Sequence, residues 1–381
     1  MKIAIIGVGG VGAMAAWRLA LAGHEVIALE QFAIDHDRGS SFGDSRIVRR
    51  VYADALYTAL MGDAYRLWDE LQSQFPGEEL FTRSGGLFLG PAEHSLLESA
   101  EHSLAASGVN YEILDPATIA QRFPAFTLFP GERAIYEPEM GYARASGCVK
   151  AAVQLARKHG TDIRTGFEVV DVARTGTQFC VTSAHGETVF CDRLVITAGP
   201  WIGQFLSRWN VRPPLVVTRQ AYVHFLPARN EAAFEVGQFP VWIDIATNAY
   251  GFPRLGSQSG IKIAFHALGE ATTPESVDRV PRDADRDRLW NYAHTRFPDL
   301  SDRVSYAKVC LYTNTPDEDF LVDWAPNLEG AVFIGGLSGH GFKFTPLLGE
   351  IAARMVTGKE VGYDLSRFRF GRLANTVNAI A

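Results

Sequence analysis

Cysteine is scarce in this sequence of 381 residues, and the four cysteines follow no metal-binding or redox spacing. They are Cys148, Cys180, Cys191 and Cys310, and no two form a CxxC pair. This pattern excludes a disulfide framework and a cysteine-based zinc site. Long hydrophobic runs are also absent, since none reaches the ~18 residues that a membrane-spanning helix needs. We therefore expect reduced cysteines, no bound metal and no membrane partner.

Positive charge is the second shortage. The chain has 43 acidic and 36 basic residues, a formal net charge of -7, and no run of five basic residues. This balance argues against non-specific binding to nucleic acid or acidic lipid. The predicted first strand begins at Lys2 and leaves no space for a cleaved signal peptide, so we expect a cytoplasmic protein. The hydrophobic fraction of 47% can fill the cores of two or three domains.

The first thirty residues carry the clearest pattern in the chain. A short apolar run at 2–6 predicts a buried strand, and an alanine-rich stretch at 11–22 predicts a helix. A second apolar run at 24–29 predicts another strand, which ends in an acidic residue. Between the first strand and the helix lies a G-x-G-x-x-G sequence. This order of elements predicts a dinucleotide site, with a glycine-rich turn that binds no ligand as the alternative.

The residue types in this motif fit a pyrophosphate. Gly7 permits the tight turn, Gly9 lets the phosphates approach the backbone, and Gly12 brings helix and strand close together. The helix N-terminus then faces the phosphate charge. We expect Glu30, at the end of the second strand, to accept hydrogen bonds from the adenosine ribose.

A polar loop rich in glycine, serine and arginine follows at 31–52. Small hydroxyl residues suit contact with phosphates and a ring edge, so we expect Ser41 and Ser45 to contact the cofactor. Arg46 and Arg49 are three residues apart, and on a helix both would point into the site. The alternative is a solvated basic turn.

Two later segments predict further parts of the nucleotide-binding sheet. A buried strand at 191–198 ends in small residues, which places Gly199 beside the cofactor. Another strand at 331–334 leads into the sequence GGLSGHGFK and then a helix from 346. The glycines of this turn, Gly339 and Gly341 among them, would let a flat ring lie on backbone amides, with the helix N-terminus facing it.

The middle of the chain predicts a different architecture. Strand-like runs at 215–226, 241–245 and 261–266 alternate as antiparallel strands do, and 250–253 predicts a turn. The fold class is therefore α+β, a Rossmann-like FAD-binding domain with an inserted antiparallel-sheet substrate domain. We expect the FAD-binding domain at 1–80, 145–212 and 305–381, and the substrate-binding domain at 81–144 and 213–304. The long insertion and the return to the first domain favour a flavin over a nicotinamide.

Several segments together resemble one enzyme family. In chain order they are GVGGVG, GDSRIVR, YGFP, IKIAFH, VCLYTNTPDEDFLVD and SGHGFK. The chain resembles the monomeric sarcosine oxidase and N-methyltryptophan oxidase family, within the D-amino-acid-oxidase-like FAD enzymes, over nearly its whole length. The resemblance implies a monomeric FAD enzyme that oxidises a secondary (N-methyl) amino acid and reduces O2 to H2O2. The imine product would hydrolyse to an amino acid and formaldehyde.

The resemblance also implies roles for single residues. Cys310 corresponds to the cysteine that holds FAD through a thioether, although an isolated free cysteine is usually a small buried hydrophobe. Arg49 and Lys343 correspond to the pair that binds the substrate carboxylate, one bidentate and one a point charge. Lys343 also lies in the glycine-rich turn, where we expect it to contact the cofactor.

Four further residues match active-site positions of the family. Lys262 corresponds to the residue that helps O2 accept electrons, whereas strand alternation alone predicts a solvated edge lysine. Arg46 matches a second positive residue beside the ring. His266 and Tyr250 match residues that shape the substrate pocket, with a core histidine and a turn tyrosine as alternatives. No residue is an obvious dedicated base.

One departure from the family concerns the substrate. Trp242 falls where the family carries a slimmer methionine, so we expect a different pocket wall. The alternative substrates are a cyclic imino acid such as pipecolate or proline, or a glycated amino acid. A nicotinamide-dependent dehydrogenase would explain only the N-terminal motif, and a cofactor-binding protein without catalysis would leave the three basic site residues without a role.

Overall fold

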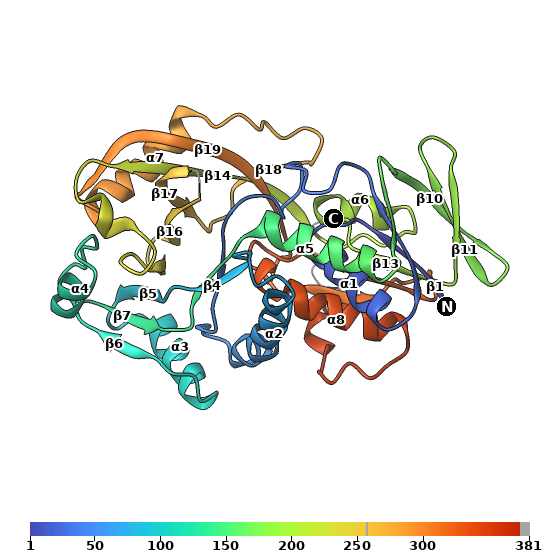
Figure 1. Cartoon of the computed structure of the whole chain (residues 1–381), viewed down its shortest axis with the longest axis horizontal. Helices are drawn as coiled ribbons and strands as arrows, with labels where there is room; N and C mark the ends of the chain where they lie inside the picture. The colour runs from blue at the N-terminus through green and yellow to red at the C-terminus, as the bar shows by residue number, and fades with distance from the viewer. Residues whose placement is uncertain (257, 374–381) are drawn as a thin grey trace.

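The first thirty residues form a strand, a helix and a parallel strand, as their sequence predicts. In the computed structural model, which describes residues 1–256 and 258–373, β1 (Lys2–Ile6) and β2 (Glu25–Glu30) are neighbours joined by α1 (Gly10–Leu21) (Figure 1). The predicted first strand and the observed β1 have the same bounds. The other two predicted elements differ from the observed ones by one residue at each end.

This unit belongs to a six-stranded sheet with the order β20-β21-β13-β1-β2-β9, parallel except for β20. Its remaining strands are β9 (Asp162–Thr165), β13 (Arg193–Ile196), β20 (Leu321–Trp324) and β21 (Ala331–Gly335). Strand residues alternate between two cores: Ile3 and Ile5 pack under the helices, while Ala4 and Ile6 face the other side.

Each face of the six-stranded sheet has its own cover. Helices α1, α5 (Ala145–Lys158) and α8 (Thr345–Val356) pack on one face, and α2 (Ala55–Ser73) packs against α8. The other face is covered by α6 (Ile202–Ser207) and by the antiparallel sheet of β10 (Val169–Thr175), β11 (Gln178–Ser183) and β12 (Thr188–Cys191). This layered body occupies the right half of Figure 1.

A nine-stranded sheet occupies the left half of Figure 1. Its order is β18-β14-β17-β16-β15-β5-β7-β6, with β19 also paired to β14, and only β15 and β5 are parallel to each other. The strands are β5 (Gly86–Pro91), β6 (Glu112–Leu114), β7 (Glu132–Glu137), β14 (Val216–Pro227), β15 (Val241–Asp244), β16 (Ala249–Leu255), β17 (Gln258–Phe265), β18 (Glu270–Thr272) and β19 (Leu300–Asn314).

Helices cover this sheet as well. Residues of α4 (Pro116–Arg122) and α7 (Asp283–Arg296) join one core with the sheet, and residues of α3 (Ser95–Ala106) join the core on its other side. A separate small sheet consists of β3 (Arg46–Val48), β8 (Gly141–Ala143) and β4 (Phe81–Arg83). None of the helices in the described residues is long and apolar enough to cross a membrane.

Three local predictions are wrong. Residues 250–253 lie within β16 and not in a turn, because the backbone there pairs with both β15 and β17 at Tyr250 and Gly251. Arg46 begins the strand β3, so the predicted helix through Arg46 and Arg49 does not form. Lys262 is not at a sheet edge, because β17 lies between β14 and β16.

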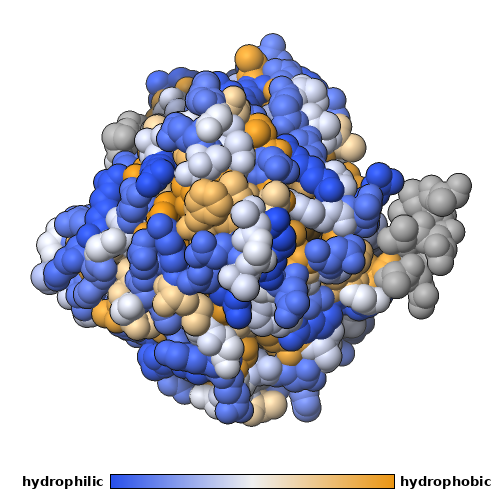
Figure 2. Space-filling model, turned by 90° about the vertical axis from the view of Figure 1, so that its right-hand side faces the viewer, coloured by the Kyte–Doolittle hydropathy of each residue, from blue (hydrophilic) through white to orange (hydrophobic). Residues whose placement is uncertain are grey.

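The division into two domains stays a prediction. Its boundary after residue 304 falls inside β19, which pairs with β14 from Leu300 to Asn314. The long strands β14 and β19 run from the left end of Figure 1 toward the layered half. The surface at the right-hand end of that view is mostly hydrophilic, with small separate hydrophobic areas (Figure 2).

Candidate active site

One large cavity joins the two halves of the molecule. Its volume is about 790 Å³, within the range of ligand and cofactor sites. It is lined by the turn after β1, the loop 35–46, the end of β13, one face of β14, β16, β17 and β19, and the glycine-rich turn before α8. These segments are far apart in the sequence, and all of them except β14 carry residues that the sequence analysis predicts for the site.

At the end of the cavity formed by the turn after β1, two positions require glycine. Gly7 has a φ of +90°, and a Cβ there would lie 2.5 Å from the carbonyl oxygen of Thr197. A Cβ on Gly12 would lie 1.9 Å from the carbonyl oxygen of Gly7. Helix α1 begins directly after Gly9, so its N-terminal N–H groups face the cavity. The turn therefore has the shape of a phosphate-binding loop.

Glu30 is buried at the adenosine end predicted for the cofactor. Its carboxylate accepts hydrogen bonds from the backbone N–H groups of Val8 (2.8 Å) and Phe32 (3.0 Å), and His36 Nε2 lies 3.4 Å away. These contacts hold the carboxylate in the cavity wall. The carboxylate oxygens have further lone pairs, which ribose hydroxyls could use.

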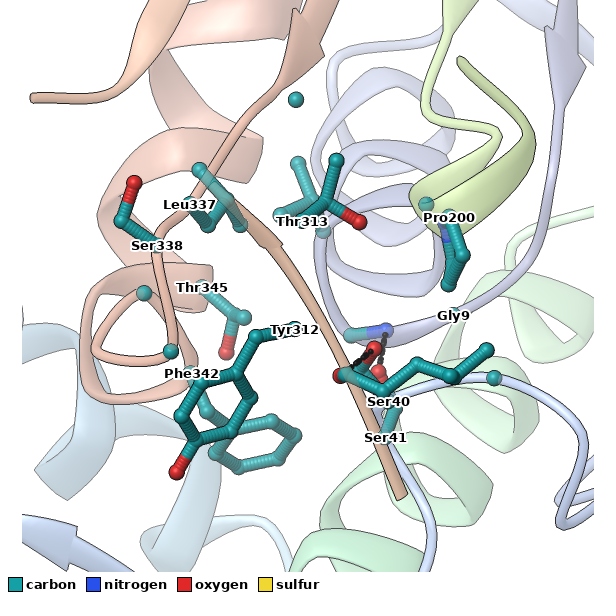
Figure 3. Close-up of a pocket in the computed structure, with 18 of the residues that line it drawn as sticks. Gly9, Ser40, Ser41, Pro200, Tyr312, Thr313, Leu337, Ser338, Phe342 and Thr345 are labelled. Atoms are coloured by element: carbon teal, nitrogen blue, oxygen red, sulfur yellow. Dashed lines mark hydrogen bonds between the residues drawn. The ribbon is translucent and has the colours of Figure 1, made fainter. Parts of the chain in front are cut away.

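The loop 40–46 is tied to the cavity floor by its own polar groups. Ser41 Oγ accepts from the N–H of Gly10 (3.0 Å), and Ser40 Oγ donates to the carbonyl of Leu311 (2.7 Å). Figure 3 shows both serines beside Gly9. Arg46 donates to the carbonyls of Ser40 and Phe42, each at 2.8 Å. Its guanidinium thus fixes the loop and places a positive charge at the cavity.

The glycine-rich turn before α8 forms the opposite wall. Gly339 has a φ of +74°, and a Cβ there would lie 2.4 Å from the ring of Tyr312; a Cβ on Gly341 would lie 2.5 Å from Leu337. In Figure 3, Tyr312, Phe342 and Thr345 border the same hollow as the serine loop. Gly199, at the end of β13, also lines it with a φ of +54°. The cavity therefore has a phosphate-binding turn at one end and a wall open to a flat ring at the other.

The side chain of Lys262, on β17, lies close to two aromatic rings. Its Nζ donates to the carbonyl oxygen (3.3 Å) and the Oγ (3.2 Å) of Ser45, and lies 4.2 Å from the ring centroid of Tyr222 and 5.0 Å from that of Phe252. Only 4% of the residue is exposed. Burial, reinforced by the charge of Arg46, lowers the pKa of Lys262 to about 7. Ser45, predicted to contact the cofactor, therefore also positions this lysine.

Arg49 and Lys343 meet at the ring of Tyr52. The guanidinium carbon of Arg49 lies 3.8 Å from the ring centroid and Nζ of Lys343 lies 5.5 Å from it. Burial, then the charge of Arg49, lowers the pKa of Lys343 well below its usual range. Neither cation forms an ion pair with a carboxylate in residues 1–256 and 258–373. A buried lysine beside a half-buried arginine forms a site for an anion such as a carboxylate.

His266 and Tyr250 lie on the same side of the cavity. His266 is half-buried, and its loss of hydration, with the charges of Lys343 and Arg49, lowers its pKa to about 4. The histidine is therefore neutral at physiological pH. Tyr250 Oη lies 3.2 Å from Tyr312 Oη, so the two phenols form a hydrogen-bonded pair in the cavity wall.

Cys310 lies on β19 and lines the cavity. It is half-buried, and burial raises the pKa of its thiol, while Arg46 and Lys262 oppose the increase. Cations near a thiol favour the reactive thiolate. Cys310 therefore lies on the cavity wall, where its thiol can reach a ring bound in the cavity.

Trp242 does not line the cavity. Its side chain is fully buried in the core on the other face of the nine-stranded sheet, where it contacts Tyr292 and Phe297. The prediction of Trp242 as a pocket wall is wrong, because successive strand residues point to opposite faces. Its neighbour Ile243 lines the cavity instead.

Some cavity residues escaped the sequence analysis. Tyr312 shares a face of β19 with Cys310, two residues earlier, so strand alternation could have identified it. His340 lies inside the glycine-rich turn, and its Nδ1 is 3.2 Å from Tyr52 Oη. Tyr52 carries no sequence signal of this kind, since its place beside Lys343 depends on the packing of distant segments. No cluster of three or more metal-ligating side chains occurs in the described part of the chain.

Comparisons with known proteins agree with this geometry. The family model for FAD dependent oxidoreductases matches residues 2–355. The chain is 33% identical to the monomeric sarcosine oxidase of Streptomyces avermitilis, covering 98% of this chain and 97% of that protein. It is 30% identical to an N-methyl-L-tryptophan oxidase of Escherichia coli, covering 97% and 98%.

A solved structure shares the fold. NikD, an unusual amino acid oxidase essential for nikkomycin biosynthesis, superposes with a TM-score of 0.85 at 24% identity, covering 96% of each chain. This likeness extends over both the layered half and the nine-stranded sheet.

Proposed function

The chain belongs to the family of FAD dependent oxidoreductases, and from this premise we propose that it oxidises a secondary amino acid with O2 as acceptor. Its similarity to a monomeric sarcosine oxidase and an N-methyl-L-tryptophan oxidase supports an N-methyl amino acid as substrate. The nicotinamide alternative does not fit this family. The products would be an amino acid, formaldehyde and hydrogen peroxide.

The observation that carries the proposal is the pair of cations around Tyr52. Arg49 and Lys343 lack a carboxylate partner in the described residues, and a substrate carboxylate would supply one. Arg49 can bind it bidentately, and Lys343 adds a point charge. The amino acid is then held by its carboxylate, with its amine and reacting carbon free to point toward the ring-binding wall.

The residues of the cavity fit FAD. The glycine turn would receive the pyrophosphate, Glu30 the ribose, and the wall of Gly339 and Gly341 the ring system. When bound, FAD would accept the hydride from the carbon beside the nitrogen and pass two electrons to O2. Lys262 would stabilise the negative charge that develops on O2, because its cation is held in place by Ser45.

The residues around the reacting carbon influence the protonation state of the substrate amine. His266 is neutral, and the two cations oppose a third positive charge nearby. A bound secondary amine therefore loses its proton more readily than in water. This effect would replace a dedicated base. His266 and Tyr250 limit the space beside the substrate, and Ile243 replaces Trp242 as the wall residue that bears on its size.

We also propose that Cys310 holds FAD covalently through a thioether. Its position on the cavity wall and the cations beside it support this attachment. Protein precipitated with acid would keep its yellow colour in the pellet, and Cys310→Ser protein would release it. Release of all colour by the unaltered protein would contradict the attachment. We further propose a monomer, which the hydrophilic face in Figure 2 and the similarity to a monomeric enzyme support.

Peroxide production in air tests the reaction directly. The panel comprises sarcosine, N-methyl-L-tryptophan, pipecolate, L-proline and a fructosyl amino acid. Turnover of an N-methyl compound with release of formaldehyde supports the proposal. Exclusive turnover of a cyclic or glycated compound would contradict it, as would amine oxidation without peroxide.

A further inference from the structure

A second cavity lies behind Lys262. Its volume is about 210 Å³, and five residues line both it and the main cavity: Asp35, Ser45, Tyr222, Phe252 and Lys262. This side chamber thus reaches the lysine from the direction away from the substrate. Asp44 and Lys150, both exposed, also line it and open it toward solvent.

The far wall of the side chamber holds a buried histidine. His224 on β14 is paired directly with Lys262 on β17, and 7% of the histidine is exposed. Its Nδ1 is fully buried without a hydrogen-bond partner in the part of the chain that the structure describes. Buried polar atoms are nearly always satisfied by protein or ordered water. The chamber has space for several water molecules, so water is the partner that His224 requires.

Burial, more than charge, keeps His224 neutral. Burial and the Lys262 cation lower its pKa to about 3, so one ring nitrogen accepts a hydrogen bond at working pH. Lys262 has three donors, and only the two oxygens of Ser45 accept from it in the described residues. The other charged or titratable groups around Lys262 are Arg46, Asp44 and Cys310. Of these, only Asp44 lines the side chamber.

The proposed oxidase reaction needs a proton at this place. Reduction of O2 to H2O2 takes two electrons and two protons. When bound, reduced FAD would supply both electrons and one proton, and the second proton would come from a donor beside the oxygen. A pKa of about 7 lets Lys262 give up that proton to the peroxide anion and regain one from water.

We propose that the side chamber holds a chain of water that returns a proton to Lys262 after each reduction of O2, and that His224 is the positioning residue for this water. The proton enters from solvent past Asp44 and Lys150 and replaces the one that leaves as part of H2O2. This inference rests on the proposed oxidase function. It gives a role to His224 and the side chamber, which have no part in the proposed substrate binding.

The kinetic test compares His224→Phe with His24→Phe. His24 also has a buried ring nitrogen without a partner in the described residues, but it is outside both cavities, so it is a matched control. The flavin is reduced by light rather than by an amino acid, and reoxidation by O2 is followed by stopped flow in H2O and D2O. We expect His224→Phe to reoxidise about 5- to 20-fold more slowly, with a larger solvent isotope effect, whereas His24→Phe matches the unaltered protein.

Added imidazole separates positioning from simple damage. The His224→Ala variant leaves space for the small base, and imidazole should restore most of its reoxidation rate. An unchanged rate and isotope effect in His224→Phe would overturn the proposal, and so would slowing without rescue in His224→Ala. Slow reoxidation of the unaltered protein itself would instead contradict the oxidase function.

A crystal structure of the FAD-loaded protein gives a second readout. We expect an ordered water within hydrogen-bonding distance of His224 Nδ1, and further water toward Asp44. A dry chamber would overturn the proposal even if the variants fail to fold.

Discussion

At the scale of single residues, the site is defined by charges that burial leaves unbalanced. Arg49 is half-buried and Lys343 buried, and burial, then the charge of Arg49, lowers the pKa of Lys343 well below its usual range. Such an arrangement is unfavourable in an empty cavity. It becomes favourable when a carboxylate binds, since the anion restores the charged state of the lysine. The substrate recognition that we propose and the electrostatic cost of the free site would therefore have the same source.

We predict that Arg49→Ala raises KM for the amino acid by about 10- to 100-fold, as loss of a charged hydrogen bond worth roughly 1.5–3 kcal/mol requires. Arg49→Lys should recover part of this loss, because it keeps the charge but not the fork. Steady-state kinetics with the preferred substrate measures both. A KM that does not change in Arg49→Ala would remove Arg49 from the carboxylate site.

Glu137 is a second residue whose state depends on burial. Its carboxylate, at the end of β7, accepts from the N–H groups of Arg50 and Val51 at 3.0 Å and thereby supports the chain beside Arg49. Burial raises the pKa of Glu137 from 4.5 to about 7, although these N–H groups oppose the increase. The folded protein therefore binds this proton more tightly than the unfolded chain.

We predict that Glu137 makes stability fall with pH. Its contribution is complete below about pH 4.5 and is lost as the pH rises to about 7. The free energy of unfolding of the unaltered protein, measured by denaturant titration, should decrease across this window relative to that of Glu137→Gln. A parallel pH dependence in both proteins would show that Glu137 does not titrate there.

At the scale of elements, the ring-binding wall depends on a close approach of the turn before α8 to β19. Gly339 and Gly237 both have positive φ, +74° and +89°. They differ in their surroundings: a Cβ on Gly339 would meet the ring of Tyr312, whereas one on Gly237 would meet nothing within 4 Å. Comparing alanine substitutions at Gly339 and Gly237 therefore distinguishes the effect of backbone strain from that of a steric clash.

We predict that Gly339→Ala loses most of its bound FAD, while Gly237→Ala retains it. Each variant carries the strain of a non-glycine residue at positive φ, about 1–2 kcal/mol. Only Gly339→Ala also displaces Tyr312. The flavin content of purified protein, read from its absorbance, checks the prediction. Equal flavin content in both variants would mean that the wall tolerates a methyl group.

At the scale of the whole molecule, the cavity that we propose for FAD also lies at the contact between the two halves. The main cavity takes its walls from the six-stranded sheet, the nine-stranded sheet and the loops between them. A ligand that binds only the folded state stabilises it by about 4 kcal/mol at a thousandfold excess over Kd. FAD should therefore stabilise the entire chain rather than one half.

We predict that Cys310→Ser protein stripped of FAD unfolds several degrees below the same protein refilled with FAD. Calorimetry measures the two Tm values, and NAD added instead of FAD serves as the control, which should give no recovery. Identical Tm values with and without FAD would contradict a site that joins both halves.

The N-terminal motif and the C-terminal turn could be predicted from local sequence. Gly12 approaches Gly7, and Gly341 approaches Leu337, each within its own turn, so at these positions the residue type reveals the local geometry. Cys310, Lys262 and Arg49 were identified by resemblance, and the structure brings all three to one cavity.

Other features could be decided only by the tertiary structure. Strand alternation does not say which face of β15 meets the cavity, so Trp242 was placed on the wrong side and Ile243 was missed. It also does not say that β17 is central, which makes Lys262 buried and lowers its pKa. The meeting of Arg49, Tyr52 and Lys343, and of Lys262 with His224, joins segments far apart in the chain. The sequence by itself determined the local turns and the cofactor class, while packing of distant segments decided which side chains face one another.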